Sequence, residues 1–221
     1  ANNVLLKQKS EPQGLIKISC PSVMMRFQIR TLLNQFLKDY PKVQIELELT
    51  SRRVDLIHDD IDLAIRTNFQ ANEDSSLIVR DVIKTMHCLV ASPELLQGRK
   101  IQHFSELHEF PSVVLGIQKS QYYWHLKNRK HDEVIDIPLQ PRIKSNDLAG
   151  VYYAVRDGLG IADLPYITVE EDIKQGQLIH VLPEWCSNLG TVQLVYASRK
   201  GQRLVMEKLI DYLVEGLRDL A

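Results

Sequence analysis

Residues 14–66 read GLIKISC, PSVMMRFQIRTLLNQFLKDY, PKVQIELEL, TSRRVDLIHDD and IDLAIR when the stretch is divided where its pattern changes. Three short apolar runs have the length of β-strands, at residues 15–20, 43–49 and 61–65. Between the first two, apolar residues return every three or four positions from Met25 to Tyr40, which predicts a helix that Ser22 is placed to cap. A short helix is expected around residues 54–57. This β-α-β-α-β order predicts an α/β fold with a mainly parallel sheet and helices on its faces.

The rest of the chain continues to mix strands and helices. Strands are predicted at residues 82–91, 112–115, 134–139, 161–162, 178–182 and 192–196, and helices at 93–96, 104–107, 148–157 and 204–217. Ser145, Asn146 and Asp147 stand where a cap for the third of these helices belongs, and Gly158 stands where a helix ends with positive φ. The cationic tract at residues 125–131 is interpreted as a solvated loop.

Composition narrows the classes of function. The chain has 221 residues, with 27 Lys and Arg against 28 Asp and Glu. It therefore lacks the overall positive charge that would attract the phosphate backbone of a nucleic acid, which disfavours nucleic-acid binding by this chain itself. No apolar run is long enough to span a bilayer, and the first residues lack a signal-peptide layout, so a soluble, cytoplasmic chain without a membrane partner is expected. Cys20, Cys88 and Cys186 are widely spaced and predict neither disulfides nor a zinc site.

The familiar motifs of catalysis and cofactor binding are missing. There is no phosphate-binding loop, nucleophile elbow, zinc-protease motif or calcium loop, and residues 158–160 follow a helix, which reverses the order of a dinucleotide fingerprint. His103 and His108 are not spaced to share one helix face. We therefore expect no enzyme activity, no cofactor and no metal. The acidic cluster at residues 170–172 is interpreted as solvated, and the aromatic cluster at residues 122–124 as core in preference to a stacking platform.

Three segments resemble those of LysR-type transcriptional regulators. They are RVDLI at residues 53–57 followed by IDLAIR at 61–66, SLIVR at 76–80 with LVASP at 89–93, and GLGIADLP at 158–165. All three occur in the family's order and spacing, and the similarity runs from about Gly14 to the C-terminus. The family often has Gly at the position of Asn68, and Asn is the residue that best replaces Gly in a left-handed turn.

The resemblance implies two Rossmann-like lobes of the type 2 periplasmic-binding-protein fold, joined by two crossover strands. Lobe I would hold residues 14–88 and 192–221, and lobe II residues 89–190. Residues 1–13 would be the end of a linker from a missing N-terminal winged helix-turn-helix domain. DNA would be a partner only through that domain.

Ligands of open α/β sheets bind beyond the carboxyl ends of the strands. This rule and the resemblance select the same effector-binding candidates: Pro21, Ser22, Val23, Arg66, Thr67, Asn68, Ser92, Ser145, Asn146 and Asp163. The helix starts at Ser22 and Ser145 offer N–H groups to an anion, and Arg66 offers a clamp. Helix capping by the two serines, and an ion pair of Arg66 with Asp62 or another carboxylate, are the structural alternatives. Asp163 instead favours a cationic or hydroxylated ligand.

The expected function is effector sensing in a bacterial transcriptional regulator. A small, anionic molecule would bind between the lobes and change the geometry of a homodimer or a dimer of dimers, with RNA polymerase as a further candidate partner. The wide apolar face of the helix at residues 25–40 predicts a dimer interface at Ile29, Leu33, Phe36 and Leu37. Two alternatives remain open. One is thiol-based redox sensing by Cys20 or Cys186, and the other is a solute-binding protein or enzyme with the same fold.

Overall fold

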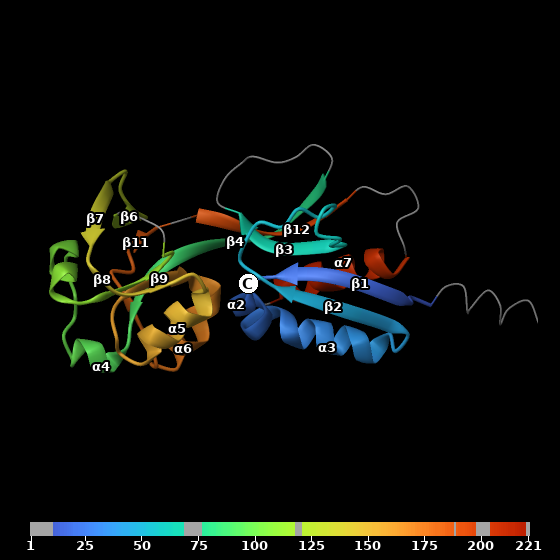
Figure 1. Ribbon diagram of the computed structural model, residues 1–221. Helices are drawn as coiled ribbons and strands as arrows, with labels where there is room; N and C mark the ends of the chain where they lie inside the picture. The colour runs from blue at the N-terminus through green and yellow to red at the C-terminus, as the bar shows by residue number, and fades with distance from the viewer. Residues whose placement is uncertain (1–10, 69–76, 118–120, 188, 198–203, 220–221) are drawn as a thin grey trace, which may run out of the picture. The chain divides into compact units, whose positions relative to one another are not determined.

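The computed structural model describes residues 11–68, 77–117, 121–187, 189–197 and 204–219. These residues form two compact units (Figure 1). Unit 1 contains the described residues up to Ile83 and from Thr191 onward, and unit 2 runs from Lys84 to Gly190. The boundaries fall in β4 (Leu77–Ala91) and near the start of β12 (Leu189–Ala197). The second lies where the sequence predicts a crossing, and the first lies a few residues earlier. Most of the predicted linker lies outside the described residues.

Unit 1 is a sheet covered by helices. Its strands are β1 (Gly14–Cys20), β2 (Val43–Leu49), β3 (Leu63–Asn68) and β12. β1 pairs in parallel with both β2 and β3, and β12 pairs antiparallel with β3. The helical segments are α2 (Ser22–Met24), the π-helix η1 (Met25–Ile29), α3 (Arg30–Asp39) and α7 (Leu204–Arg218). The parallel arrangement of β1, β2 and β3 agrees with the predicted β-α-β start.

Two local predictions in unit 1 are wrong. Pro21, not Ser22, is the N-cap residue of α2, and it makes no side-chain capping hydrogen bond. The segment around residues 54–57 forms turns instead of a helix. There the Asp55 carboxylate accepts hydrogen bonds from the backbone N–H groups of Ile57 and His58, both at 3.0 Å. A side chain that satisfies the backbone locally competes with helix formation.

The apolar stripe of the first helix is buried inside unit 1, so the predicted dimer interface needs correction. Ile29, Leu33 and Phe36 are at most 2% exposed, and only Leu37 is half-buried. The ring of Phe36 lies 5.4 Å from that of Tyr212 on α7, which packs beside α3. The helix has a wide apolar face because it contacts the sheet and α7 within one chain. Three of the four predicted interface side chains are therefore not at the surface.

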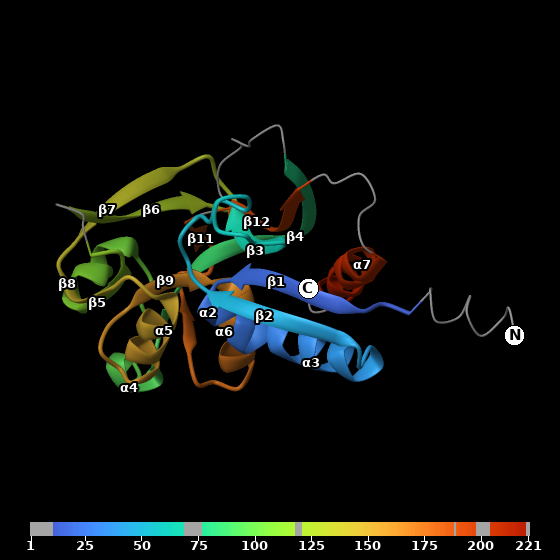
Figure 2. The same cartoon turned by 45° about the vertical axis from the view of Figure 1, so that its right-hand side comes forward.

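Unit 2 contains two small sheets and the C-terminal half of β4, from Lys84 onward. Its helical elements are α4 (Pro93–Leu96), η2 (Phe104–Glu109), α5 (Leu148–Arg156) and α6 (Tyr166–Lys174). Its strands are β5 (Ser112–Leu115), β6 (Tyr122–Asn128), β7 (Val134–Leu139), β8 (Pro141–Ser145), β9 (Ala162–Pro165), β10 (Ile179–Val181) and β11 (Trp185–Cys186). β4 pairs antiparallel with β9 and β10, β5 pairs in parallel with β8, and β6 lies between β7 and β11. Figure 2 shows α5 and α6 on one side of unit 2 and β6 and β7 on the other.

Several elements of unit 2 differ from the sequence prediction. β6 extends into the predicted loop at residues 125–131, and β8, β11 and α6 were not predicted. Asp172, from the acidic cluster expected to be solvated, is only 8% exposed. It accepts hydrogen bonds from the hydroxyl of Tyr152 and the guanidinium of Arg156, both at 2.6 Å. A carboxylate with two such donors is stable in a buried position.

The motif at residues 158–165 has a structural role in unit 2. Gly158 follows α5 with a φ of +74°, as the sequence predicts. At Gly160 a Cβ atom would stand 2.8 Å from the carbonyl oxygen of Pro111, closer than real Cβ atoms approach. This close approach lets Ile161 exchange backbone hydrogen bonds with Pro111 and Val113, at 2.8 and 2.9 Å. The two glycines therefore have different roles. Gly158 allows the turn after α5, and Gly160 allows the close approach of two backbone segments.

No helix among the residues described in the structure is long and apolar enough to cross a membrane.

Candidate functional site

The candidates from unit 1 meet at one edge of its sheet. Ser22 and its neighbours follow β1, and Arg66, Thr67 and Asn68 end β3. Because β1 and β3 are parallel and adjacent, their carboxyl ends lie at the same edge. The hydroxyl of Thr67 lies 3.8 Å from the sulfur of Met24, which confirms that the two segments are neighbours. The side chain of Val23 is buried, so this residue offers a ligand only its backbone.

Arg66 is positioned by two residues that the sequence analysis missed. Its Nε donates to the Gln193 side-chain oxygen at 3.4 Å, and the Gln193 amide nitrogen donates to Asp81 at 2.8 Å. Gln193 is 7% exposed and stands directly opposite Arg66 in the pairing of β3 with β12. This pairing joins residues 127 positions apart, so no local sequence signal reveals it.

The candidates at residues 145–147 form a tight loop before α5. The Ser145 hydroxyl donates to the carbonyl oxygen of Asp147 at 2.8 Å and accepts from the backbone N–H of Asp147 at 3.1 Å. Asp147 is the N-cap residue of α5 and makes no side-chain capping hydrogen bond. Asn146 is exposed. Ser145 therefore fixes the loop and does not cap the helix, and the first N–H groups of α5 can hold an anion.

Asp163 forms a second, more buried polar group in unit 2. Its carboxylate accepts a hydrogen bond from the hydroxyl of Ser187 at 2.6 Å and lies 3.2 Å from Nδ1 of His87 on β4. Its other oxygen, Oδ1, is buried and has no hydrogen-bond partner among the residues described. With His87 it lines a cavity of about 200 Å³. A buried acceptor atom of this kind favours a ligand that carries a hydroxyl or ammonium donor.

The structure gives Ser92 a role other than ligand binding. Its side chain is 2% exposed, and its hydroxyl oxygen accepts a hydrogen bond from the backbone N–H of Leu95 at 3.1 Å. Ser92 is thus the N-cap of α4, so we withdraw it from the set of effector contacts.

His103 and Glu106, considered for metal ligation in the sequence, both contribute to the start of η2. The Nδ1 atom of His103 accepts from the backbone N–H of Ser105 at 3.3 Å, and the Glu106 carboxylate accepts from the backbone N–H of His103 at 2.8 Å. These two bonds form a capping box. Within the described ranges, no group of three or more His, Cys, Asp or Glu side chains is arranged to hold a metal ion.

The three cysteines are free thiols and all are buried. Burial raises the pKa of Cys20 to about 12. Burial also raises the pKa of Cys88, and the nearby charge of Asp163 adds to this effect. The pKa of Cys186 is raised as well, again chiefly by burial. Because the thiolate is the reactive species, these environments weaken the case for redox sensing.

We expect Cys20 to react very slowly with iodoacetamide in the folded protein at pH 8. A rise of its pKa from 9.0 to about 12 lowers the thiolate fraction about a thousandfold. Alkylation followed by mass spectrometry, with the urea-unfolded chain as the control, measures this ratio. A native rate equal to that of the unfolded chain would restore the redox alternative.

Comparisons with known proteins identify the family of the chain. Residues 9–218 match the LysR substrate binding domain family. The probable HTH-type transcriptional regulator LtrA of Klebsiella pneumoniae is 31% identical over 207 residues, which cover 92% of this chain and 66% of LtrA. The regulatory domain of AphB in Vibrio vulnificus is 29% identical with a TM-score of 0.75, over 92% of this chain and 98% of that one. The CrgA regulatory domain from Neisseria meningitidis, at 24% identity, has a TM-score of 0.81 over 95% and 100% of the two chains and supports the fold alone.

The chain belongs to the LysR substrate-binding domain family, and its fold is the periplasmic-binding-protein type 2 fold. It spans just under two thirds of the length of LtrA. The matched relatives are transcriptional regulators and the matched family is a domain of such proteins, so the chain is an effector-binding regulatory domain and not an enzyme.

Proposed function

We propose that this chain senses a small anionic effector for a bacterial transcriptional regulator that acts in the cytoplasm. The observation that carries the proposal is the position of Arg66, held by Gln193 at the sheet edge where the first helix of unit 1 begins. A guanidinium beside the start of a helix is well suited to a carboxylate or phosphate.

Unit 2 would contribute a second set of contacts, from Ser145, Asn146 and the first turn of α5. Asp163 would add a contact of another kind, because its buried Oδ1 requires a hydrogen-bond donor. The effector that best fits both sets is a small acid that also carries a hydroxyl or amino group. Such an effector would shift a conformational equilibrium only through its different affinities for the two states.

In the whole protein, the bound effector would change how a homodimer or dimer of dimers presents separate DNA-binding domains. The similarity to LtrA supports this part of the proposal, since LtrA is described as an HTH-type regulator. The dimer contact itself is assigned to exposed positions of the α3 region, because Ile29, Leu33 and Phe36 are buried in unit 1.

A thermal-shift screen of small hydroxy and amino acids tests the effector proposal. A ligand at 100 times its Kd adds about 2.7 kcal/mol to the free energy of unfolding. We expect the shift to disappear in Arg66→Ala and in Ser145→Ala, and to shrink in Asp163→Asn for acids that carry a donor group.

The matched controls are Arg80→Ala and Ser105→Ala. Arg80 forms an exposed ion pair with Asp211, and Ser105 lies in η2, so neither belongs to the proposed contacts. A ligand whose shift survives in both Arg66→Ala and Ser145→Ala would contradict the assignment of these residues.

A further inference from the structure

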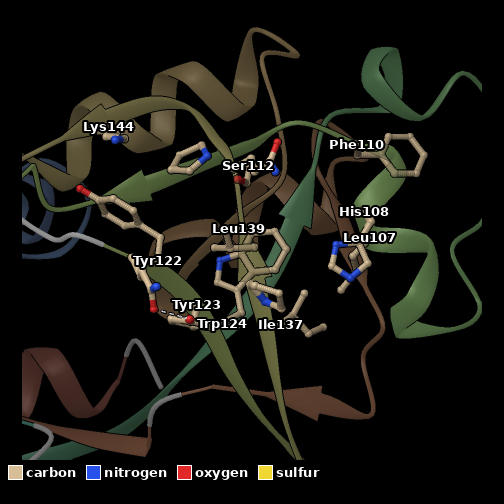
Figure 3. Close-up of a pocket in the computed structure, with 14 residues that line it drawn as sticks. Leu107, His108, Phe110, Ser112, Tyr122, Tyr123, Trp124, Ile137, Leu139 and Lys144 are labelled. Atoms are coloured by element: carbon tan, nitrogen blue, oxygen red, sulfur yellow. Dashed lines mark hydrogen bonds between the residues drawn. The ribbon is translucent and has the colours of Figure 1, made fainter.

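Unit 2 contains a second cavity that the proposed effector contacts do not use. Its volume is about 560 Å³, within the usual range of small-molecule sites. The walls come from η2, β5, β6, β7 and β8, and Figure 3 shows Leu139 and Trp124 in the middle of the close-up, with Tyr122 and Lys144 to one side and His108 to the other. None of its lining residues is among the effector-binding candidates.

The aromatic cluster at residues 122–124 forms much of the wall. Tyr122 and Trp124 are 7% and 5% exposed, and Trp124 belongs to the hydrophobic core of unit 2. Tyr123 points the other way along β6 and is 51% exposed. The cluster is therefore partly core, as the sequence predicts, and it also presents aromatic surface to the cavity. Such surface favours a flat, apolar molecule.

Ser112 has a buried hydroxyl whose hydrogen-bonding capacity the described part of the fold leaves unsatisfied. The residue is 96% buried, it lines the cavity, and its hydroxyl has no hydrogen-bond partner among the described residues. A buried hydroxyl without a partner is unfavourable, so a bound molecule that offers it a polar atom gains affinity.

The charge of the lining favours an anion. Among the described residues that line it, Lys144 and His108 are basic and none is Asp or Glu. The Lys144 ammonium lies 4.9 Å from the centre of the Tyr122 ring. This contact holds the positive charge beside the aromatic wall, where it can meet a carboxylate.

We propose that this cavity binds a planar aromatic carboxylate as a second ligand site, beside the cavity of Asp163, with which it shares Tyr122, Tyr123, Trp124 and Leu139. The rings would pack against Trp124 and Tyr122, which lie on one face of β6, the carboxylate would face Lys144, and a polar substituent would bond to Ser112. The site goes beyond the proposed function because it lies wholly within unit 2 and needs no residue of unit 1.

The test uses three probes: 6-hydroxy-2-naphthoate, its amide, and 2-naphthoate, which lacks the hydroxyl. Binding is measured by calorimetry on the unmodified protein. It is also measured by quenching of Trp124 fluorescence in Trp185→Phe, since the chain has two tryptophans. We expect saturable binding, tightest for the hydroxylated acid. Lys144→Gln should weaken both acids about fivefold, as expected for an exposed ion pair, and leave the amide unchanged. Ser112→Ala should remove the preference for the hydroxylated acid over 2-naphthoate.

The matched control is Lys100→Gln, another exposed lysine of unit 2 that does not line the cavity. Equal weakening by Lys100→Gln and Lys144→Gln would mean nonspecific attraction and would overturn the site. So would the absence of saturable binding, or an unchanged preference in Ser112→Ala. Arg66→Ala and Asp163→Asn together separate the two proposals: binding of the naphthoates should be unaffected by either change, and its loss in either variant would place them at the effector contacts instead.

Discussion

Phe36→Ala is expected to lower the free energy of unfolding by about 3–5 kcal/mol, because it removes a fully buried ring of α3 that packs against the rings of Tyr40 and of Tyr212 on α7. This value is a large fraction of the stability of an ordinary domain. Urea unfolding followed by circular dichroism measures it.

The same experiment decides whether the apolar stripe of α3 is core or interface. Replacing a core residue should lower the free energy of unfolding by the same amount at low and high protein concentration. Replacing an interface residue should lower it more at high concentration, where the dimer forms. Phe27→Ala is the matched control, since Phe27 lies in the same helical run and is 37% exposed, and it should cost about 1 kcal/mol at most. A concentration-dependent effect of Phe36→Ala would contradict its burial in unit 1.

The second large effect is expected at Gly160. Gly160→Ala should lower the free energy of unfolding by about 1–3 kcal/mol, because the new Cβ would stand 2.8 Å from the backbone oxygen of Pro111 and 3.0 Å from a methyl group of Val113. The backbone at Pro111 cannot rotate away as a flexible side chain can. Thermal and urea unfolding of the purified variant measure the loss.

Gly158 provides the comparison, because its constraint is conformational and not steric. At Gly158 we expect Asn to be tolerated better than Ala, since Asn accepts a positive φ and the nearest atom to a new Cβ is the Ser92 hydroxyl at 3.3 Å. At Gly160 the order should reverse, because Asn is larger than Ala. The same order at both positions would show that one mechanism governs the two glycines.

Much of the fold can be read from the sequence because its elements have strong periodic patterns. α3 and α7 bury one face each, and the spacing of their apolar residues shows this directly. β1 is found as a short apolar run that is buried at its end, whereas β2 is found from its alternation although Leu47 and Leu49 are exposed. The failures have local causes. β8 and α6 lack a clear apolar period, and around Asp55 the side chain bonds its own backbone in place of a helix.

The sequence predicted those residues of the candidate site that follow the ends of predicted strands, and it missed the others. The rule for parallel sheets correctly brings Ser22 and Arg66 to one edge. Gln193 and His87 were missed because they reach Arg66 and Asp163 through strand pairing over long sequence distances. The predicted interface named three buried side chains for a related reason: a wide apolar stripe shows that a helix is covered, but not whether its own chain or another covers it.

The π-helix η1 has an evolutionary consequence. Its wide turn, closed by a hydrogen bond from the N–H of Arg30 to the oxygen of Met25, places one more residue between Ser22 and the buried stripe than an α-helix would. Because the wide turn takes up this residue, deleting it would restore regular winding while Ser22 and Phe36 keep their positions relative to each other. A one-codon change of length in this turn would therefore be tolerated by both the buried stripe and the sheet edge, without refolding the domain.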